Sequence, residues 1–267
     1  MMPSLDALAA SYSVILCDIW GVVHDGARLL PGAQERLLAW KRARKRIILI
    51  TNAPRPASTV RHGLDQLGLP RGAYDAITSS GEAGISALVQ PRRDVGFLGT
   101  ADDRGDLVAH GVSLIADGFT EIACTGLDEH RDDPADYREQ LSEWAKRGVT
   151  MHCLNPDRVV VHCGVREACA GALADIYEDL GGSVAWYGKP HAPIYAHALR
   201  LAGDPPLNKV LAVGDGLVTD MLGAARMGID ALFVASGIHA GQQIPLDFAA
   251  RHGLGDWQPI ATVEDLS

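Results

Sequence analysis

The 267-residue chain is poor in the features that mark several protein classes. Its five cysteines are odd in number and contain no Cys-x-x-Cys pair, so we predict reduced thiols, not a disulfide framework. Residues 1–13 lack the basic segment of a secretion signal, and no apolar run is long enough to span a bilayer. We therefore expect a cytoplasmic protein that has no membrane partner.

Positive charge is also scarce. Lys and Arg number 24 against 33 Asp and Glu, which gives a net charge of -9. A protein that binds the nucleic-acid backbone needs a basic surface, so no nucleic-acid partner is expected. Small anionic substrates stay open, because a local field can oppose the net charge. No Gly-x-Ser-x-Gly elbow occurs, which disfavours a serine hydrolase.

The chain does contain short apolar runs that each end in a polar residue. These runs are 14–17, 47–50 and 210–213, and the residues that follow them are Asp18, Thr51-Asn52 and Gly214-Asp215. Continuous β-branched runs with helical stretches between them are typical of a parallel sheet covered on both faces. The ligand site of such a sheet lies beyond the carboxyl ends of its strands, where these polar residues would meet.

Helical patterns, and a change of sequence pattern in the middle of the chain, complete the predicted fold. Helices are expected over 31–44 and 220–227, the second ending at Gly228, with a strand at 231–234. The middle of the chain has a polar acidic stretch at 128–136, a helix pattern at 137–146 and a short strand at 159–161. We predict an α/β protein, with residues 1–81 and 186–267 as its core and 82–185 as an inserted second domain.

The polar residues suit one reaction. Phosphoryl transfer to a protein needs a nucleophilic oxygen, a cation that offsets carboxylate–phosphate repulsion, and donors around the phosphoryl oxygens. Asp18 would form an aspartyl-phosphate, and with Asp215 and Asp220 it offers an all-oxygen ligand set that suits Mg²⁺ better than zinc. Lys189 would screen the phosphate charge, and Thr51 would donate to a phosphoryl oxygen.

These segments resemble the four motifs of the haloacid dehalogenase (HAD) superfamily, and the likeness continues through Ser236-Gly237. The matching segments are 18–21, Thr51-Asn52, Gly188-Lys189-Pro190, and Gly214-Asp215 with Thr219-Asp220. Asn155-Pro156-Asp157 and the long insertion resemble the class IIA, p-nitrophenyl phosphatase-like branch. The resemblance implies a Rossmann-like core with an α/β cap domain, and Mg²⁺-dependent hydrolysis of a small phosphorylated metabolite.

The resemblance also implies roles for single residues. Asp18 and Lys189 would be catalytic, and Thr51, Asn52 and Lys189 would bind the substrate. Asp18, Asp215, Asp220 and the backbone carbonyl of Trp20 would hold the metal. Cap-mediated dimers are common among the relatives that the chain resembles, which leaves a homodimer open.

Trp20 departs from the family pattern. Phosphatases of the family carry a second Asp there, which protonates the leaving alcohol and then activates water. Its replacement removes the acid–base group and typically lowers the rate ~10²–10⁴-fold. The indole either packs at the core–cap junction or offers a stacking surface to an aromatic substrate. His24 and Asp25 lie close by in sequence, but a loop histidine and a turn-forming aspartate are favoured over a substitute acid.

Two further patterns are interpreted as structural. His152-Cys153 and His162-Cys163 resemble zinc ligands, but neighbouring strand residues face opposite sides and cannot chelate together. Asn155 and Asp157 are expected to shape a turn in the cap.

Three candidate functions remain, ranked here from the most to the least favoured. The first is a weak Mg²⁺-dependent phosphatase. The second is a non-catalytic protein that binds or senses a phosphorylated ligand on the same scaffold. A haloacid dehalogenase ranks below both, because metal-free dehalogenases lack the acid pair that Asp215 and Asp220 supply.

Overall fold

The computed structural model describes residues 5–162, 165–235 and 244–267, and the chain forms two compact units. Unit 1 contains Met1–Thr51, Arg61–Thr78 and Tyr195–Ser267, and unit 2 contains Asn52–Val60 and Ser79–Ile194. The predicted inserted domain, 82–185, lies inside the long segment of unit 2. Unit 2 also includes residues 52–60, 79–81 and 186–194, so it is larger than the predicted domain. The predicted domain limits stay a prediction.

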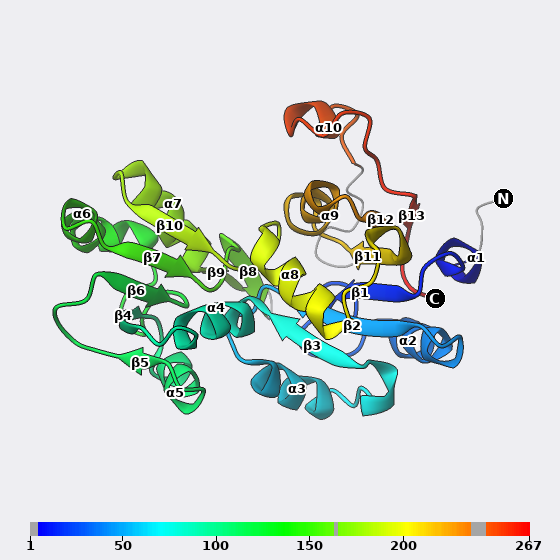
Figure 1. The fold of residues 1–267 in the computed structure, drawn as a ribbon, viewed down its shortest axis with the longest axis horizontal. Helices are drawn as coiled ribbons and strands as arrows, with labels where there is room; N and C mark the ends of the chain where they lie inside the picture. The colour runs from blue at the N-terminus through cyan, green and yellow to red at the C-terminus, as the bar shows by residue number, and fades with distance from the viewer. Residues whose placement is uncertain (1–4, 163–164, 236–243) are drawn as a thin grey trace. The chain divides into compact units, whose positions relative to one another are not determined.

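Unit 1 is built on a sheet with the strand order β13-β12-β11-β1-β2-β3 (Figure 1). β1 pairs in parallel with β2 and β11, and β12 pairs in parallel with β11 and β13. The strands are β1 (Val14–Asp18), β2 (Arg46–Thr51), β3 (Ala76–Ser79), β11 (Val210–Gly214), β12 (Asp230–Val234) and β13 (Ala261–Val263). All residues of β1 and β11 are buried, which explains why they appear in the sequence as unbroken apolar runs.

Both predicted helices of unit 1 are present, although each is shorter than expected. α2 buries Ala33, Leu37 and Trp40, which lie on one helical face, and it ends in two basic residues. α9 ends at Gly228, whose φ of 66° is left-handed, as a glycine C-cap requires. The helical segments are α1 (Leu5–Ala9), α2 (Ala33–Arg42), η1 (Arg71–Ala73), η3 (Leu207–Lys209), the π-helix η4 (Leu217–Met221), α9 (Leu222–Met227) and α10 (Phe248–Arg251). Helices α3 (Ala57–Gln66) and α8 (Ala192–Leu201) lie where the chain passes between units.

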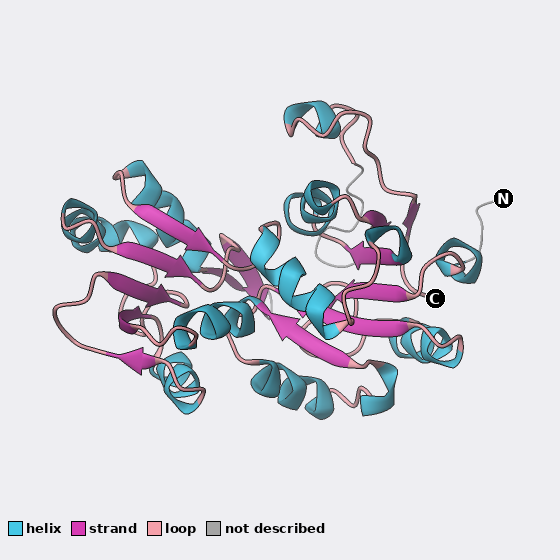
Figure 2. Cartoon of the chain, viewed as in Figure 1, coloured by secondary structure: helices cyan, strands magenta, loops and turns pink. Residues whose placement is uncertain are grey.

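Unit 2 has its own parallel sheet, in the order β10-β7-β6-β4-β5, whose strands are labelled in Figure 1 and drawn magenta in Figure 2. β5 lies beside β4 at one edge of the sheet, and β6, β7 and β10 follow in order on the other side of β4. The strands are β4 (Asp94–Leu98), β5 (Ser113–Leu114), β6 (Glu121–Cys124), β7 (Thr150–Cys153) and β10 (Ser183–Trp186), with an antiparallel pair β8 (Val159–His162) and β9 (Val165–Ala168). The helical segments are α4 (Ser80–Val89), α5 (Ala101–Ala109), η2 (Pro134–Tyr137), α6 (Arg138–Lys146) and α7 (Ala170–Asp179). The predicted α/β class with parallel sheets is confirmed.

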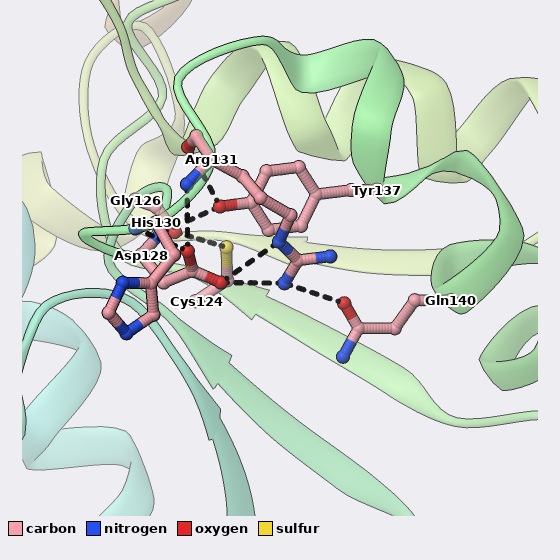
Figure 3. Close-up of polar contacts among 7 residues, drawn as sticks. All are labelled: Cys124, Gly126, Asp128, His130, Arg131, Tyr137 and Gln140. Carbon is pink, nitrogen blue, oxygen red and sulfur yellow. Dashed lines mark hydrogen bonds and ion pairs between the residues drawn. The ribbon is translucent and has the colours of Figure 1, made fainter.

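The acidic stretch after β6 is an ordered loop built around Tyr137, which is fully buried (Figure 3). The Tyr137 hydroxyl accepts a hydrogen bond from the Asp128 amide at 2.8 Å and donates one to the Arg131 carbonyl at 3.1 Å. The Arg131 guanidinium lies 3.7 Å from the centre of the Tyr137 ring and donates to the Asp128 carboxylate at 2.6 Å. Asp128 and Arg131 are thus paired within the loop.

In the part of the chain that the structure describes, no helix has both the length and the apolar character needed to cross a membrane.

Candidate functional site

Three buried carboxylates meet at the carboxyl end of the unit 1 sheet. Asp18 is the last residue of β1, Asp215 follows β11 directly, and Asp220 lies in the π-helix η4. β1 and β11 are parallel neighbours with Cys17 opposite Val213, so their ends lie side by side. The side chains are only 6%, 4% and 4% exposed, and one oxygen from each lies within 4.8 Å of the others. The predicted convergence of these three aspartates is what the fold produces.

The loop that carries Asp215 and Asp220 is folded around the second of these carboxylates. The Asp220 Oδ2 atom accepts hydrogen bonds from the Gly216 amide and the Thr219 hydroxyl, each at 3.2 Å. A side chain at Gly214 would place its Cβ 2.2 Å from the Asp220 carboxyl carbon. Glycine at this position therefore lets the backbone approach close enough for the loop to close over Asp220.

Gly21 plays the same part for Asp215. Its φ is +82°, and a Cβ there would lie 2.2 Å from the Asp215 Oδ2 atom. The turn after β1 therefore packs its bare backbone against this carboxylate. The position of Asp215 depends on two neighbouring strand ends, not on its own loop alone.

The donor set fits a hard divalent cation. Carboxylates held this close repel one another, and burial in a low-dielectric interior strengthens that repulsion. A cation bound by oxygen ligands removes the conflict, and Mg²⁺ and Ca²⁺ are the ions that prefer such ligands. Within the described ranges, Asp18, Asp215 and Asp220 form the one group of three or more potential metal-ligating side chains.

Trp20 packs into the turn that follows β1. Its ring meets the His24 ring edge to face, with 5.3 Å between centroids and 76° between planes. A Cβ at Gly26 would lie 2.5 Å from the Trp20 Cη2 atom, so the indole also lies directly on the backbone of this turn. The Trp20 side chain is therefore part of the packing of its own loop.

His24 and Asp25 have structural roles in the same turn. The Gly26 amide donates to His24 Nδ1 at 2.9 Å, and burial lowers the pKa of His24 although nearby Asp25 opposes this. The Asp25 carboxylate accepts from the Ala27 and Arg28 amides at 3.0 Å, and these bonds lower its pKa. Both side chains are thus engaged in hydrogen bonds within the turn. A loop histidine and a turn-forming aspartate are what the structure contains.

The predicted substrate-binding residues belong to both units. Thr51 ends β2 in unit 1 and is 8% exposed. Asn52 and Lys189 lie in unit 2, are 5% and 3% exposed, and contact each other. The Asn52 amide also donates to the Asp157 carboxylate at 2.8 Å. The sequence gives no signal for this last contact, because the two residues are separated by 105 positions.

The remaining motif residues behave mainly as expected. The Asp157 amide donates to the Asn155 side chain at 3.2 Å, which is the predicted turn. His152 hydrogen-bonds Tyr187 at 2.8 Å, whereas Cys153 joins the apolar cluster that includes Cys124 and Tyr137. The two side chains thus face opposite sides of the sheet and the predicted absence of chelation is confirmed for this pair. Cys163 and Ser236-Gly237 lie outside the described residues.

Comparison with known proteins agrees with these motifs. Residues 15–113 match the haloacid dehalogenase-like hydrolase family model, and residues 186–256 match a second, HAD-hydrolase-like model. A haloacid dehalogenase-like hydrolase from Brucella suis is 32% identical, with a TM-score of 0.87 and complete coverage of both chains. The acid sugar phosphatase of Staphylococcus saprophyticus is 24% identical over 88% of this chain and 90% of its own.

Other solved structures share the fold. The glycerol phosphate phosphatase of Mycobacterium tuberculosis, solved in complex with magnesium, is 22% identical over all of this chain and 78% of its own, with a TM-score of 0.74. Solved p-nitrophenyl phosphatases have the same fold, as the resemblance to class IIA predicts. Family models at both ends and a full-length relative above 30% identity leave one assignment: the chain belongs to the haloacid dehalogenase-like hydrolase family.

Proposed function

We propose that the protein is a Mg²⁺-dependent phosphatase of a small phosphorylated metabolite and works through an aspartyl-phosphate at Asp18. The observation that carries the proposal is the buried cluster of Asp18, Asp215 and Asp220, whose oxygens lie within 4.8 Å of one another. The names of the relatives support the substrate class, because they act on sugar phosphate or glycerol phosphate. The magnesium complex of one of them supports the metal.

The residues divide the reaction as follows. Asp18, Asp215, Asp220 and the Trp20 carbonyl would hold Mg²⁺, and the ion would offset the repulsion between the Asp18 carboxylate and the substrate phosphate. An Asp18 oxygen attacks phosphorus, the bond to the leaving alcohol oxygen breaks, and water later cleaves the aspartyl-phosphate to release phosphate. The support for Asp18 as the nucleophile is its place at the end of β1 in the family's first motif.

Thr51 and Lys189 act on the transferring phosphoryl group. Thr51 donates its hydroxyl to a phosphoryl oxygen, and the Lys189 ammonium screens the phosphate charge. Their support is their match to the family motifs, together with their burial, which strengthens electrostatic interactions by excluding water. Residues 82–185 form the cap that selects the substrate.

Trp20 makes turnover slow. The leaving alcohol takes its proton from solvent, because an indole cannot supply one and His24 and Asp25 are engaged in their turn. Loss of general acid–base help lowers rates by ~10²–10⁴-fold, and hydrolysis of the aspartyl-phosphate suffers most, since water receives no base. A long-lived phosphoenzyme follows.

The test is an assay of phosphate release from p-nitrophenyl phosphate, with and without Mg²⁺, combined with intact mass measurement. We expect slow, Mg²⁺-dependent release or a phosphate adduct in the wild type, neither in Asp18→Asn, and faster turnover in Trp20→Asp. Release that does not depend on Mg²⁺, or an Asp18→Asn variant as active as wild type, would contradict the proposal.

The second candidate is a protein that binds a phosphorylated ligand without turnover. It is favoured by one observation, the packing of the Trp20 indole against His24 and Gly26, which puts no acid–base group at position 20. This function predicts Mg²⁺-assisted, saturable binding of a phosphorylated ligand in calorimetry, and activity that appears only in Trp20→Asp. A dehalogenase fits less well, since Asp215 and Asp220 are both buried beside Asp18.

A further inference from the structure

Asn52 holds the backbone of Lys189 on both sides. The Lys189 amide donates to Asn52 Oδ1 at 2.7 Å, and Asn52 Nδ2 donates to the Lys189 carbonyl at 3.1 Å. Both residues are almost completely buried, so water does not compete for these bonds. One side chain, 137 positions away in sequence, thus sets the backbone of the motif lysine.

The second donor hydrogen of the Asn52 amide is used as well. Asn52 Nδ2 donates to Asp157 Oδ1 at 2.8 Å. Asp157 is itself fixed, because its amide donates to the Asn155 side chain at 3.2 Å and its carbonyl accepts from the Gly171 amide at 3.0 Å. A primary amide has two donor hydrogens, and those of Asn52 go to Lys189 and Asp157. What the Asn52 side chain has left is acceptor capacity on Oδ1, which a phosphate oxygen would not favour.

Gly188 shows how closely these three segments pack. A Cβ at Gly188 would lie 2.6 Å from Asn52 Oδ1 and 2.5 Å from the Pro156 ring. The turns that end β7 and β10 therefore enclose the Asn52 amide, and its hydrogen-bonding geometry has little room to change.

We propose that the Asn52 side chain is a positioning group and not a substrate ligand: with Asp157 it fixes the backbone from which Lys189 acts. This inference rests on the proposed function, in which Lys189 screens the phosphate charge. A misplacement of about 1 Å in a catalytic group can lower activity by about 10²-fold. Damage to the Asn52 contacts should therefore reduce kcat, through Lys189, more than it raises KM.

Asn52→Asp and Asp157→Asn provide the test, because the first change keeps the shape of the side chain and the second can repair it. Asn52→Asp keeps the acceptor for the Lys189 amide but turns a carboxylate oxygen toward the Lys189 carbonyl and the Asp157 carboxylate. We expect kcat for p-nitrophenyl phosphate to fall about 10²-fold. Adding Asp157→Asn restores a hydrogen bond of reversed direction, and we expect it to recover at least about tenfold of the lost kcat.

A second comparison asks whether Asn52 acts through Lys189. In a Lys189→Ala background, Asn52→Asp should lower kcat by less than about twofold, because the group that it positions is gone. If Asn52→Asp does not fold, as judged by circular dichroism and a urea unfolding curve, Asn52→Ala takes its place in this comparison.

The outcomes separate the two proposals. A wild type without Mg²⁺-dependent phosphate release or adduct removes the proposed function, and the positioning role falls with it. An active wild type in which Asp157→Asn gives no recovery, and in which Asn52 and Lys189 substitutions multiply, overturns the positioning role alone. In that case Asn52 touches the substrate, since a carboxylate at this position repels phosphate whatever residue 157 is.

Discussion

The contact between Gly21 and Asp215 allows a direct test of the proposed metal site. Gly21→Ala would place a Cβ 2.2 Å from Asp215 Oδ2, where ordinary contact begins at 3.4 Å. The carboxylate must then move by about 1.2 Å. Metal sites tolerate ligand displacements of only about 0.2 Å, and Mg²⁺ demands near-ideal geometry. We expect Mg²⁺ affinity to fall by at least about tenfold.

The same substitution also strains the backbone, and that effect has to be separated. Gly21 has a φ of +82°, and an L-residue in this region costs about 1–2 kcal/mol. Gly68 provides a matched control: its φ is +83°, and no heavy atom of the described residues lies within 4 Å of a Cβ built there. Gly68→Ala therefore reproduces the strain without touching the carboxylates.

The assay combines urea unfolding in metal-free buffer with calorimetric titration of Mg²⁺ into each folded protein. Gly68→Ala should lose about 1–2 kcal/mol of unfolding free energy, and Gly21→Ala should lose at least as much because it adds the clash with Asp215. Only Gly21→Ala should lose Mg²⁺ affinity. Equal Mg²⁺ affinity in the two variants would refute the assignment of Asp215 as a ligand held by the turn after β1.

Three further outcomes concern stability. Tyr137→Phe should lower the unfolding free energy by about 1–3 kcal/mol, measured in urea, because it leaves two loop backbone groups without their partner. Gly223→Ala places a Cβ 2.2 Å from the Tyr195 hydroxyl and should cost about 1–3 kcal/mol, part of which Tyr195→Phe restores in the double variant; strict additivity would contradict the clash. Burial lowers the pKa of His152, so below about pH 6.5 the unfolded chain gains a proton that the folded protein refuses. Unfolding free energy should therefore fall with pH below that value, by at most about 1.4 kcal/mol per unit, and His152→Gln should flatten the profile; an unchanged slope would count against it.

Much of the fold could be predicted because local and tertiary preferences agree. The apolar runs before Asp18, Thr51 and Gly214 are buried on both faces of a parallel sheet, and such burial leaves a clear trace in sequence. The helix expected over 31–44 is observed as Ala33–Arg42. The helix capped by Gly228 is preceded by a short π-helix that the hydrophobic periodicity does not predict. This π-helix brings Asp220 toward Asp215.

The candidate site was predictable in composition but not in its contacts. The positions of Asp18 and Asp215 follow from strand ends, since neighbouring parallel strands finish at the same edge. The partners of Asn52 do not follow, because hydrogen bonds over more than a hundred positions depend on how three separate turns pack. The contact between Trp20 and His24 spans only four positions, but it depends on the shape of the turn after β1, which the sequence pattern does not predict.

The pairing of β1 with β11 has a consequence for how the protein is made. Val14 pairs with Val210, so two central strands of one sheet are about 200 residues apart in the chain. At about 5–20 residues per second, a ribosome needs roughly 10–40 s to deliver β11 after β1 has emerged. All strands of the unit 2 sheet are synthesised within that interval. Asp18 is therefore synthesised long before Asp215 and Asp220, and the cluster of three carboxylates is complete only when the last quarter of the chain has joined the sheet.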